Sequence, residues 1–391
     1  MAFAVGLDIL AAQAFSFLRG KRVGVVCNQA SVDSSYRHIL ELLDAVEIGA
    51  VFGPQHGLFG TTQDNMIEWN GEGVPRRPYP TYSLYGEHRE PTDAMLAGLD
   101  LLLIDLPDVG SRYYTFIWTT SLCIKAAARV GLPVLVLDRP NPIGSAVEGP
   151  GIEPGFESFV GLYNVPIRHG KTIGEIARYV ADNYHPTTEL EVINVEGWDR
   201  TLHADHTPYR WVMPSPNMPT IDTAMVYPGG CLLEATNLSE GRGTTRPFEI
   251  VGAPFIDGGR LASALNGLGI EGAYFRALQF EPTFNKHHGK ICEGVQVHIL
   301  DRSAFRPVLA YGCLINEVVK QTGIHDSSHV KLGRFQATSD ETQLPGFAWK
   351  QPPYEYVYDR MPIDILSGSE TFRNLVESGA NLNLIDQWTF S

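Results

Sequence analysis

The first 140 residues contain four short, nearly continuous apolar runs, and these constrain the fold more than any other feature of the sequence. The runs are RVGVVCN (22–28), IGAVFGP (48–54), LDLLLIDLP (99–107) and LPVLVLDRP (132–140). Apolar runs without polar alternation are typical of strands that are buried on both faces of a parallel sheet. Helical patterns lie between them, at residues 36–45, 91–100 and 116–131. This regular alternation of strand and helix predicts a doubly wound α/β domain.

Each of these runs ends in polar residues. They are Asn28 and Gln29 after the first run, Gln55 and His56 after the second, Asp105, Asp108, Ser111 and Arg112 after the third, and Asp138, Arg139 and Asn141 after the fourth. In open α/β sheets, ligands bind outside the carboxyl ends of the strands. We therefore expect Gln55 and His56 to lie at a strand-to-loop corner that faces a shared crevice.

The second half of the chain has a different pattern, in which strand-like segments alternate with loops rich in Gly, Pro and Asn. Residues 190–198 and 293–300 are expected to be strands of this part. The sequence YPGG, which begins at Tyr227, interrupts the chain. Because 391 residues are many for one domain, we place a boundary there and expect domains 1–227 and 228–391.

The net charge and the missing motifs disfavour several classes of ligand. A net charge of −14 disfavours nucleic acids, whose phosphates an acidic chain repels. The corner after the first run, CNQASVD, lacks the G-x-G-x-x-G pattern of dinucleotide sites, and no G-x-x-x-x-G-K-[ST] loop occurs. Neither H-E-x-x-H nor an Asp-rich calcium loop is present, and we expect the adjacent His287 and His288 to be a surface or loop pair. No metal or nucleotide cofactor is therefore expected.

The cysteines and the apolar segments bear on the compartment. The five cysteines include no C-x-x-C pair, and Cys27 and Cys123 are expected to be buried thiols, which fits a reducing compartment. No apolar run approaches the roughly 18 residues of a membrane-spanning helix. Residues 1–24 are expected to contain an N-terminal helix of the fold rather than a signal peptide. We expect a cytoplasmic protein if the chain is full length, and an extracytoplasmic one if a signal segment has been removed.

The segment PIRHGKTIGEIARYV (166–180) contains two candidate acid–base groups, His169 and Glu175. Thr172 and Glu175 also have the spacing of a capping box, in which the glutamate accepts a hydrogen bond from the backbone at the start of a helix. The capping and the catalytic role of Glu175 are about equally supported. His169 lies in the loop before the cap and is the better site candidate.

The loop SEGRGTTRPFE (239–249) is a candidate anion site. It places Glu240, Arg242 and Arg246 among small residues, whose backbone amides can approach a ligand, and the arginine fork matches a carboxylate. The alternative is a structural turn whose arginines pair with local glutamates. A functional role is favoured because loops carry function more often than cores do.

Two further arginines follow predicted strands. The segment DVGSRYY (108–114) offers Arg112 and Tyr113 as a second anion-binding group. Asp138 and Arg139 are adjacent, so they could neutralise each other as a structural pair.

The loop MPSPNMPT (213–220) contains three prolines, which fix the backbone and could hold Ser215 and Asn217 rigidly. A serine hydrolase of the α/β type would need an elbow such as G-x-S-x-G, and none occurs. We therefore interpret Ser215 as a binding or turn residue rather than a nucleophile.

Motifs spread over nearly the whole chain follow one another in the order of a known family. They are GKRVGVVCNQASVD, FGPQHGLFG, SLYG, DLPDVGSRYYTF, VLDRPNPIG, SFVGLYNVPIRHGKTIGE, PSPNMPT, YPGGCLLEATNLSEGRGTTRPFEIVGAPF and FNKHHGKICEGVQVH. Together they resemble the NamZ-type exo-β-N-acetylmuramidases, a family of peptidoglycan hexosaminidases. The resemblance implies a Rossmann-like N-terminal domain with a parallel sheet, catalytic here over residues 1–227, and a smaller α+β auxiliary domain over 228–391. It also implies release of β-1,4-linked N-acetylmuramic acid from the non-reducing ends of peptidoglycan fragments, without a cofactor.

The resemblance and the loop positions together predict the site. The catalytic candidates are Gln55, His56, Glu175 and Glu240, and the substrate-binding candidates are Asn28, Arg112, Tyr113, Arg139, Asn141, His169, Asn217, Asn237, Arg242 and Arg246. N-acetylmuramic acid carries a lactyl carboxylate, so an acidic protein needs local arginines to bind it. The expected partner is a peptidoglycan-derived saccharide or muropeptide, and no oligomeric state is predicted.

One departure from the family pattern concerns Gln55. The family pattern at this corner is Gly-Pro-Glu-His-Gly, and the resemblance implies that its glutamate is the general acid. An amide has nearly the same shape but cannot donate an acid proton. Either the chain is an engineered, inactivated enzyme, or it is a natural paralogue with weak or altered activity, or position 55 binds substrate while Glu175, Glu234, Glu240 or an aspartate transfers the proton. The rival interpretation is a catalytically silent sugar-binding protein.

Overall fold

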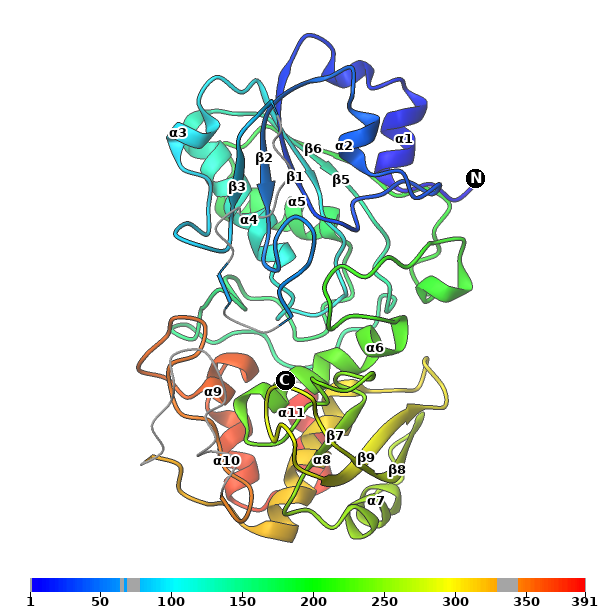
Figure 1. Cartoon of the computed structure of the whole chain (residues 1–391), viewed down its shortest axis with the longest axis vertical. Helices are drawn as coiled ribbons and strands as arrows, with labels where there is room; N and C mark the ends of the chain where they lie inside the picture. The colour runs from blue at the N-terminus through cyan, green and yellow to red at the C-terminus, as the bar shows by residue number, and fades with distance from the viewer. Residues whose placement is uncertain (1, 64–66, 69–77, 329–343, 391) are drawn as a thin grey trace. The chain divides into compact units, whose positions relative to one another are not determined.

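The computed structural model describes residues 2–63, 67–68, 78–328 and 344–390. The chain divides into two compact units (Figure 1). The first unit comprises Met1–Gly110, Tyr114–Ala146 and Gly170–Ile221, and the second comprises Ser111–Tyr113, Val147–His169 and Asp222–Ser391. The division therefore differs from the single boundary expected at residue 227, because two segments from the N-terminal half of the chain belong to the second unit.

The first unit contains a six-stranded parallel sheet with the order β3-β2-β1-β4-β5-β6. The strands are β1 (Arg22–Cys27), β2 (Glu47–Gly53), β3 (Thr81–Ser83), β4 (Leu101–Asp105), β5 (Val134–Leu137) and β6 (Leu190–Ile193). The four apolar runs are thus confirmed as β1, β2, β4 and β5. The strand expected at residues 190–198 is shorter than predicted and belongs to this same sheet as β6. The order is that of doubly wound nucleotide-binding folds, with its switch point between β1 and β4.

Helices cover both faces of this sheet (Figure 1). They are α1 (Gly6–Ala12), α2 (Ile39–Leu42), α3 (Asp93–Leu96), α4 (Phe116–Val130) and α5 (Ile173–Tyr184), with short 3-10 turns at Ser16–Leu18 and Ala204–His206. Val23, Val25 and Cys27 of β1 share a buried core with α1 and α2. The alternate residues Gly24 and Val26 point to the other face and are equally buried, which explains why the run is apolar without interruption.

Local signals place the helix ends as expected. Thr92 caps α3 by accepting a hydrogen bond from the backbone N–H of Met95 at 3.3 Å. Gly131 ends α4 in the left-handed conformation, with φ of +67°. The N-terminal helix expected within residues 1–24 is α1. These ends follow from short-range chemistry, so the sequence could predict them.

The second unit is built around a three-stranded antiparallel sheet with the order β7-β9-β8. Its strands are β7 (Ile250–Ala253), β8 (Ala273–Phe280) and β9 (Cys292–Ile299), and its helices are α7 (Gly258–Gly267), α8 (Pro307–Thr322), α9 (Pro362–Ser367), α10 (Thr371–Glu377) and α11 (Leu382–Thr389). Helix α6 (Ile221–Gly230) and the 3-10 turn Cys231–Ala235 join the chain to this part. The strand predicted at 293–300 is confirmed as β9, and the α+β class is also confirmed.

The segment 147–169 belongs to the second unit because it is bonded to helix α8. The carboxylate of Glu148 accepts hydrogen bonds from the backbone N–H groups of Val308 and Leu309, at 3.2 and 2.9 Å. These two groups lie in the first turn of α8, where backbone N–H groups have no partner within the helix. A negative side chain at this end is also favoured by the helix dipole.

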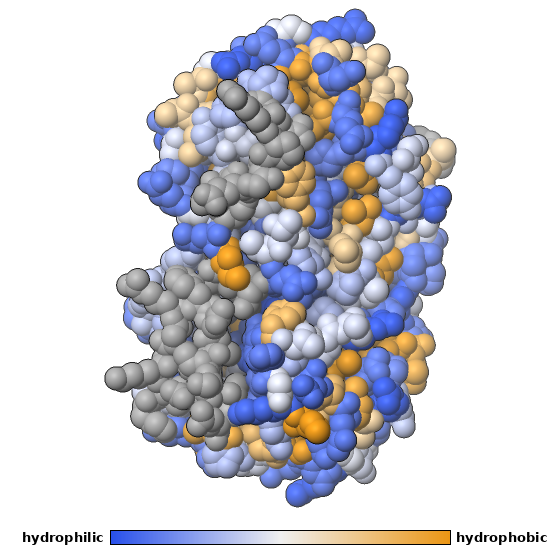
Figure 2. All heavy atoms as spheres, in the orientation of Figure 1, coloured by the Kyte–Doolittle hydropathy of each residue, from blue (hydrophilic) through white to orange (hydrophobic). Residues whose placement is uncertain are grey.

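Apolar side chains are dispersed rather than concentrated on the visible face of the described residues (Figure 2). On the face drawn in Figure 2, hydrophobic residues are scattered among hydrophilic ones. Within the described ranges, no helix has both the length and the apolar character that crossing a membrane would require. All five cysteines are buried, including Cys27 and Cys123 as predicted.

Candidate active site

The carboxyl ends of β1, β2 and β4 bring several buried polar side chains to one edge of the six-stranded sheet. Asn28 follows β1, Gln55 follows β2 and Asp108 follows β4, and each is at most 6% exposed. Because β1 and β4 flank the switch point of the sheet, this edge is where a doubly wound fold binds its ligand.

Gln55 is held at the start of helix α4. Its Oε1 accepts a hydrogen bond from the hydroxyl of Thr115 at 2.6 Å. Thr115 directly precedes α4 and makes no capping bond with its side chain, so its hydroxyl serves Gln55 instead. Because Oε1 is oriented towards this donor, the NH2 group of the amide forms the other end of the carboxamide.

His56 lies in a strained turn. Its φ is +67°, in the left-handed region that few residues other than glycine adopt, and Gly57 follows with φ of +80°. The ring Nδ1 lies 2.7 Å from the carbonyl oxygen of Thr62. A carbonyl can only accept, so Nδ1 carries the hydrogen and Nε2 is the acceptor of the neutral ring.

Asn28 and Asn217 fasten the proline-rich loop 213–220 to this edge. Asn28 donates from Nδ2 to the carbonyl of Pro214 at 2.8 Å, and Gln29 donates to the carbonyl of Met213 at 2.7 Å. Asn217 donates to the carbonyl of Gln63. These asparagines were predicted to bind substrate, and the structure gives both of them a role in positioning the loop.

Asp108 is a buried carboxylate at the same edge. Its Oδ2 accepts a hydrogen bond from the backbone N–H of Gly110 at 2.9 Å. Burial raises the pKa of the neighbouring Tyr114 hydroxyl above its usual range, the Ser215 side chain opposes this, and the charge of Asp108 adds to it. Asp108 and Ser215 thus act in opposite directions on the pKa of the Tyr114 hydroxyl. The sequence placed Asp108 after a strand, but not among the site residues.

The ion pair between Arg139 and Asp138 that the sequence allowed does not form. Arg139 pairs with Asp105 rather than with Asp138, through bonds of 2.6 and 2.8 Å that are buried. Asp138 instead accepts hydrogen bonds from the start of α5, including the backbone N–H of Gly174 at 2.8 Å. Asn141 donates to the carbonyl of Lys171 at 3.0 Å. Arg139 reaches Asp105 because Asp105 is the last residue of β4, Arg139 follows β5, and these two strands are neighbours in the sheet.

Glu175 has the capping role. Its Oε2 accepts a hydrogen bond from the backbone N–H of Thr172 at 3.0 Å, and the Thr172 hydroxyl accepts one from the backbone N–H of Glu175 at 3.1 Å. Arg200 forms an ion pair with the same carboxylate at 3.1 Å. The capping alternative is therefore confirmed, and this carboxylate is already engaged at the first turn of α5.

Arg112 and Tyr113 lie in the second unit, and both are buried. Arg112 is fully buried, and its guanidinium donates to the carbonyls of Pro150, Val165 and Leu366 at 2.7 to 2.9 Å. Burial lowers the pKa of this guanidinium to about 10. Tyr113 is 2% exposed. Arg112 therefore joins three segments of its own unit.

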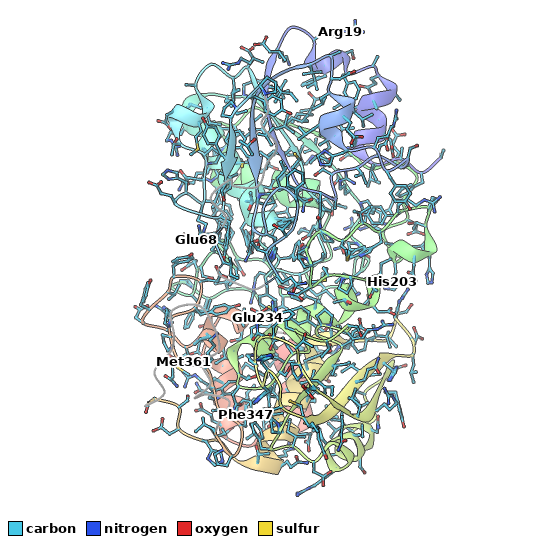
Figure 3. All side chains as sticks on the ribbon, viewed as in Figure 1. Arg19, Glu68, His203, Glu234, Phe347 and Met361 are labelled. Atoms are coloured by element: carbon cyan, nitrogen blue, oxygen red, sulfur yellow. The ribbon has the colours of Figure 1, made fainter. Side chains whose placement is uncertain are left out.

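The loop 239–249 contributes to a buried network of ion pairs in the second unit. Arg242 pairs with Glu234 at 2.8 Å and with Glu240 at 2.7 Å, and Lys286 pairs with Glu240 at 2.9 Å. Figure 3 labels Glu234, whose other oxygen accepts a hydrogen bond from the Tyr354 hydroxyl at 2.6 Å. We call Glu234, Glu240, Arg242, Lys286 and Tyr354 the buried ion network.

This network sets the protonation state of Glu240. Burial alone would raise the pKa of its carboxyl, but the charges of Lys286 and Arg242 outweigh burial and lower the pKa to about 2. A carboxyl with this pKa is ionised near neutral pH and cannot act as a general acid. The structural alternative for the loop, arginines paired with local glutamates, is thus confirmed for Arg242. Sequence gave no signal for Lys286 or Tyr354, because they lie far from Glu240 along the chain.

The remaining candidates are also in the second unit. Arg246 pairs with Glu249 at 3.1 Å and keeps a side chain that is 46% exposed. Asn237 exchanges hydrogen bonds with the backbone of Gly346 and Ala348, both at 2.9 Å. His169 is buried.

His287 and His288 lie in a turn, which agrees with the loop alternative of the prediction. His288 is exposed, but His287 is buried, with its Nε2 2.7 Å from the carbonyl oxygen of Asn237. Burial lowers the pKa of His287 to about 4, so the ring is neutral at physiological pH. Among the residues that the structure describes, no group of three or more His, Cys, Asp or Glu side chains could hold a metal ion.

The predicted site residues thus divide between the two units. The first unit contains Asn28, Gln55, His56, Arg139, Asn141, Glu175 and Asn217, and the second contains Arg112, Tyr113, His169, Asn237, Glu240, Arg242 and Arg246. Within the first unit, Asn28 after β1 binds the loop 213–220, and Gln55 after β2 binds Thr115 before α4.

Comparison with known proteins identifies the family. The model of the exo-β-N-acetylmuramidase NamZ N-terminal region matches residues 23–222, and that of its C-terminal region matches residues 225–389. The chain is 43% identical over 350 residues to a protein of Bacillus subtilis (strain 168) named peptidoglycan beta-N-acetylmuramidase NamZ, covering 88% of this chain and 82% of that protein.

Two solved structures from Bacteroides fragilis NCTC 9343, both described as DUF1343 family proteins, have the same fold. The first has a TM-score of 0.82 and 28% identity, covering 99% of this chain and 94% of that one. The second has a TM-score of 0.68 and 24% identity with the same coverage, and supports the fold alone. Because both family models match and together extend over nearly the whole sequence, the chain belongs to the exo-β-N-acetylmuramidase NamZ family.

Proposed function

We propose that this protein hydrolyses β-1,4-linked N-acetylmuramic acid from the non-reducing ends of peptidoglycan fragments. The observation that carries the proposal is its 43% identity to the Bacillus subtilis muramidase over most of both chains. The polar edge of the six-stranded sheet supports it, because that edge is where this fold class binds ligands.

Glycoside hydrolysis needs two functions, and we propose that this chain has kept one and weakened the other. One group protonates the glycosidic oxygen, and a second assists attack at the anomeric carbon, either directly or through the acetamide of an N-acetyl sugar. The resemblance implies a glutamate where this chain has Gln55. The amide can donate a hydrogen bond to the glycosidic oxygen but cannot transfer a proton to it. We therefore expect slow cleavage of sugars whose leaving group needs protonation.

The second function falls, in this proposal, to Asp108. It is buried at the end of β4, beside the switch point of the sheet. The charge of Asp108 raises the pKa of Tyr114. The next residue, Thr115, donates a hydrogen bond to Gln55. Residues 114–115 therefore connect Asp108 with Gln55. Asp105 at the same edge is engaged by Arg139. Asp108 would activate water or orient the acetamide of the substrate.

An Asp108→Asn variant is expected to lower kcat for a 4-nitrophenyl β-N-acetylmuramide by about 10²- to 10⁴-fold, with little change in KM. The substitution keeps the shape of the side chain and removes its charge. Release of nitrophenol measures the rate, and thermal unfolding checks the fold. Asp33→Asn is the matched control, because Asp33 is an equally buried carboxylate that pairs with Arg37. Equal kcat in the wild type and the Asp108→Asn variant would contradict the assignment.

We also propose that the protein acts in a reducing compartment, on fragments that have been imported. All five cysteines are buried thiols, which suits such a compartment. Fractionation of cells that produce the protein naturally tests this, and accumulation in the culture supernatant would contradict it.

A further inference from the structure

A short hairpin in the second unit has an unusual turn. Tyr354 and Val357 exchange two backbone hydrogen bonds, of 3.0 and 2.9 Å, across the two residues Glu355 and Tyr356. Both central residues have positive φ, +44° for Glu355 and +66° for Tyr356. A two-residue turn with two positive φ values is of type I′, which strongly prefers Asn and Gly. Here a glutamate and a tyrosine occupy positions that disfavour L side chains.

The buried ion network holds this turn in place. Tyr354, the first residue of the hairpin, is 2% exposed and donates its hydroxyl to Glu234 at 2.6 Å. Glu234 is in turn paired with Arg242 at 2.8 Å. A backbone conformation that the local sequence disfavours persists only where surrounding contacts impose it, and such conformations concentrate at functional sites.

Two exposed tyrosines lie in and directly after this hairpin. Tyr356, at the position where type I′ turns prefer glycine, is 36% exposed, and Tyr358 is 72% exposed. A tyrosine ring offers an apolar face and a polar hydroxyl. A pyranose ring is complementary to it, because one face of the sugar presents C–H groups while its hydroxyl groups point outwards to accept and donate hydrogen bonds.

We propose that the turn Tyr354–Tyr358 is a sugar-binding platform, on which Tyr356 stacks against a pyranose ring of a β-1,4-linked N-acetylhexosamine chain. The inference deepens the proposed function and rests on it for the class of ligand. The strained turn then has a purpose, since it positions a rigid aromatic side chain where a stable turn would have glycine.

The test measures binding and stability together. The probe is the β-1,4-linked tetrasaccharide of N-acetylglucosamine, which carries no muramic acid for the proposed reaction to release, and its dissociation constant is measured by titration calorimetry. Tyr356→Gly removes the ring and relieves the strain, so we expect affinity to fall by about tenfold or more while Tm stays equal or rises. Tyr356→Phe keeps the stacking face and should bind within about threefold of the wild type.

Tyr36→Gly is the matched control. Tyr36 is a tyrosine of the first unit that is 58% exposed and has φ of +63°, so its replacement relieves similar strain. We expect it to leave the affinity for the tetrasaccharide unchanged. If Tyr356→Gly does not fold, Tyr356→Asn replaces it, because asparagine tolerates this conformation.

Each outcome decides the proposal. No binding by the wild type, or equal binding by the wild type and Tyr356→Gly, would overturn it, and so would an equal loss in Tyr36→Gly. Failure of the proposed function would be seen in a different assay. The wild type would then release no chromophore from 4-nitrophenyl β-N-acetylmuramide, whatever its affinity for the tetrasaccharide.

Discussion

A Gln55→Glu variant is expected to cleave a peptidoglycan-derived disaccharide about 10²- to 10⁴-fold faster than the protein with Gln55. Gln55 is buried, and its Oε1 is fixed by the Thr115 hydroxyl at 2.6 Å. Glutamate has nearly the same shape, so one carboxyl oxygen can keep this bond while the other carries the proton that the glycosidic oxygen needs. Burial disfavours the charged form of a carboxyl group, which helps it to act as an acid.

The leaving group shows whether position 55 acts through proton transfer. A nitrophenolate departs without protonation, so Gln55→Glu should accelerate cleavage of the 4-nitrophenyl β-N-acetylmuramide by less than about tenfold. A sugar hydroxyl is a poor leaving group, and its release should show the full gain. The gain should also disappear as pH rises through the pKa of the new carboxyl group, because only the protonated form is an acid.

Gln29→Glu is the control for this variant. It adds the same charge at the same edge of the sheet, at a residue whose amide donates to the carbonyl of Met213 at 2.7 Å. No gain is expected from it. Equal acceleration of both substrates by Gln55→Glu would mean that position 55 binds the sugar rather than protonating it. If neither protein cleaves either substrate but both bind muropeptide, the silent sugar-binding protein is the better interpretation.

The second large effect concerns stability. A Lys286→Met variant is expected to lower the free energy of unfolding by about 3–5 kcal/mol, measured by urea denaturation. The Lys286 ammonium is buried, pairs with Glu240 at 2.9 Å and donates to the carbonyls of Leu233 and Leu238 at 2.8 and 3.1 Å. Its removal leaves Glu240 with one cation fewer and two carbonyls without this donor. For comparison, the total free energy of unfolding of a typical domain is only about 5–15 kcal/mol.

The same variant should change how stability depends on pH. Although burial opposes it, the charges of Lys286 and Arg242 lower the pKa of Glu240 from 4.5 to about 2. A depressed carboxyl pKa contributes stability that is present above pH 4.5 and is lost as pH falls towards 2. Without Lys286 the pKa of Glu240 should rise, so this acid-dependent loss should shrink.

Lys320→Met provides the comparison. Lys320 pairs with Glu317 at 2.6 Å on helix α8, but its side chain is 44% exposed. Exposed pairs contribute about 0–1 kcal/mol, so this variant should unfold at nearly the urea concentration of the wild type. If Lys286→Met and Lys320→Met had equally small effects, the network would not stabilise the second unit.

Structural features were predicted correctly from the sequence where they depend on residues close together in the chain. The run RVGVVCN became β1 because its residues are buried on both faces, and Thr172 with Glu175 forms a capping box within one turn of helix. Prediction failed where a partner comes from elsewhere in the chain. Arg112 looked suited to an anion, but it binds Leu366, which is 254 positions away. Nothing near Arg112 in the sequence indicates that contact.

The hairpin at Glu355–Tyr356 is an element that the sequence did not predict at all. Type I′ turns are recognised by Asn and Gly, and Glu355–Tyr356 has neither, so the sequence contained no sign of a hairpin there. The contact that holds it, from Tyr354 to Glu234, joins residues 120 positions apart. The preference of Glu355 and Tyr356 for negative φ is outweighed by contacts with distant residues. A short segment of sequence contains no information about such contacts.

The sequence by itself determined the parallel sheet, the helix ends, the family and the strand-to-loop corner that contains Gln55 and His56. These follow from periodicity, capping and motif order, all of which act over a few residues or are carried in the letters themselves. Only the tertiary structure decided which charged residues neutralise one another. It paired Arg139 with Asp105, and Arg242 with Glu234 and Glu240. The physical reason is that burying a charge requires a partner, and the fold selects that partner across the chain.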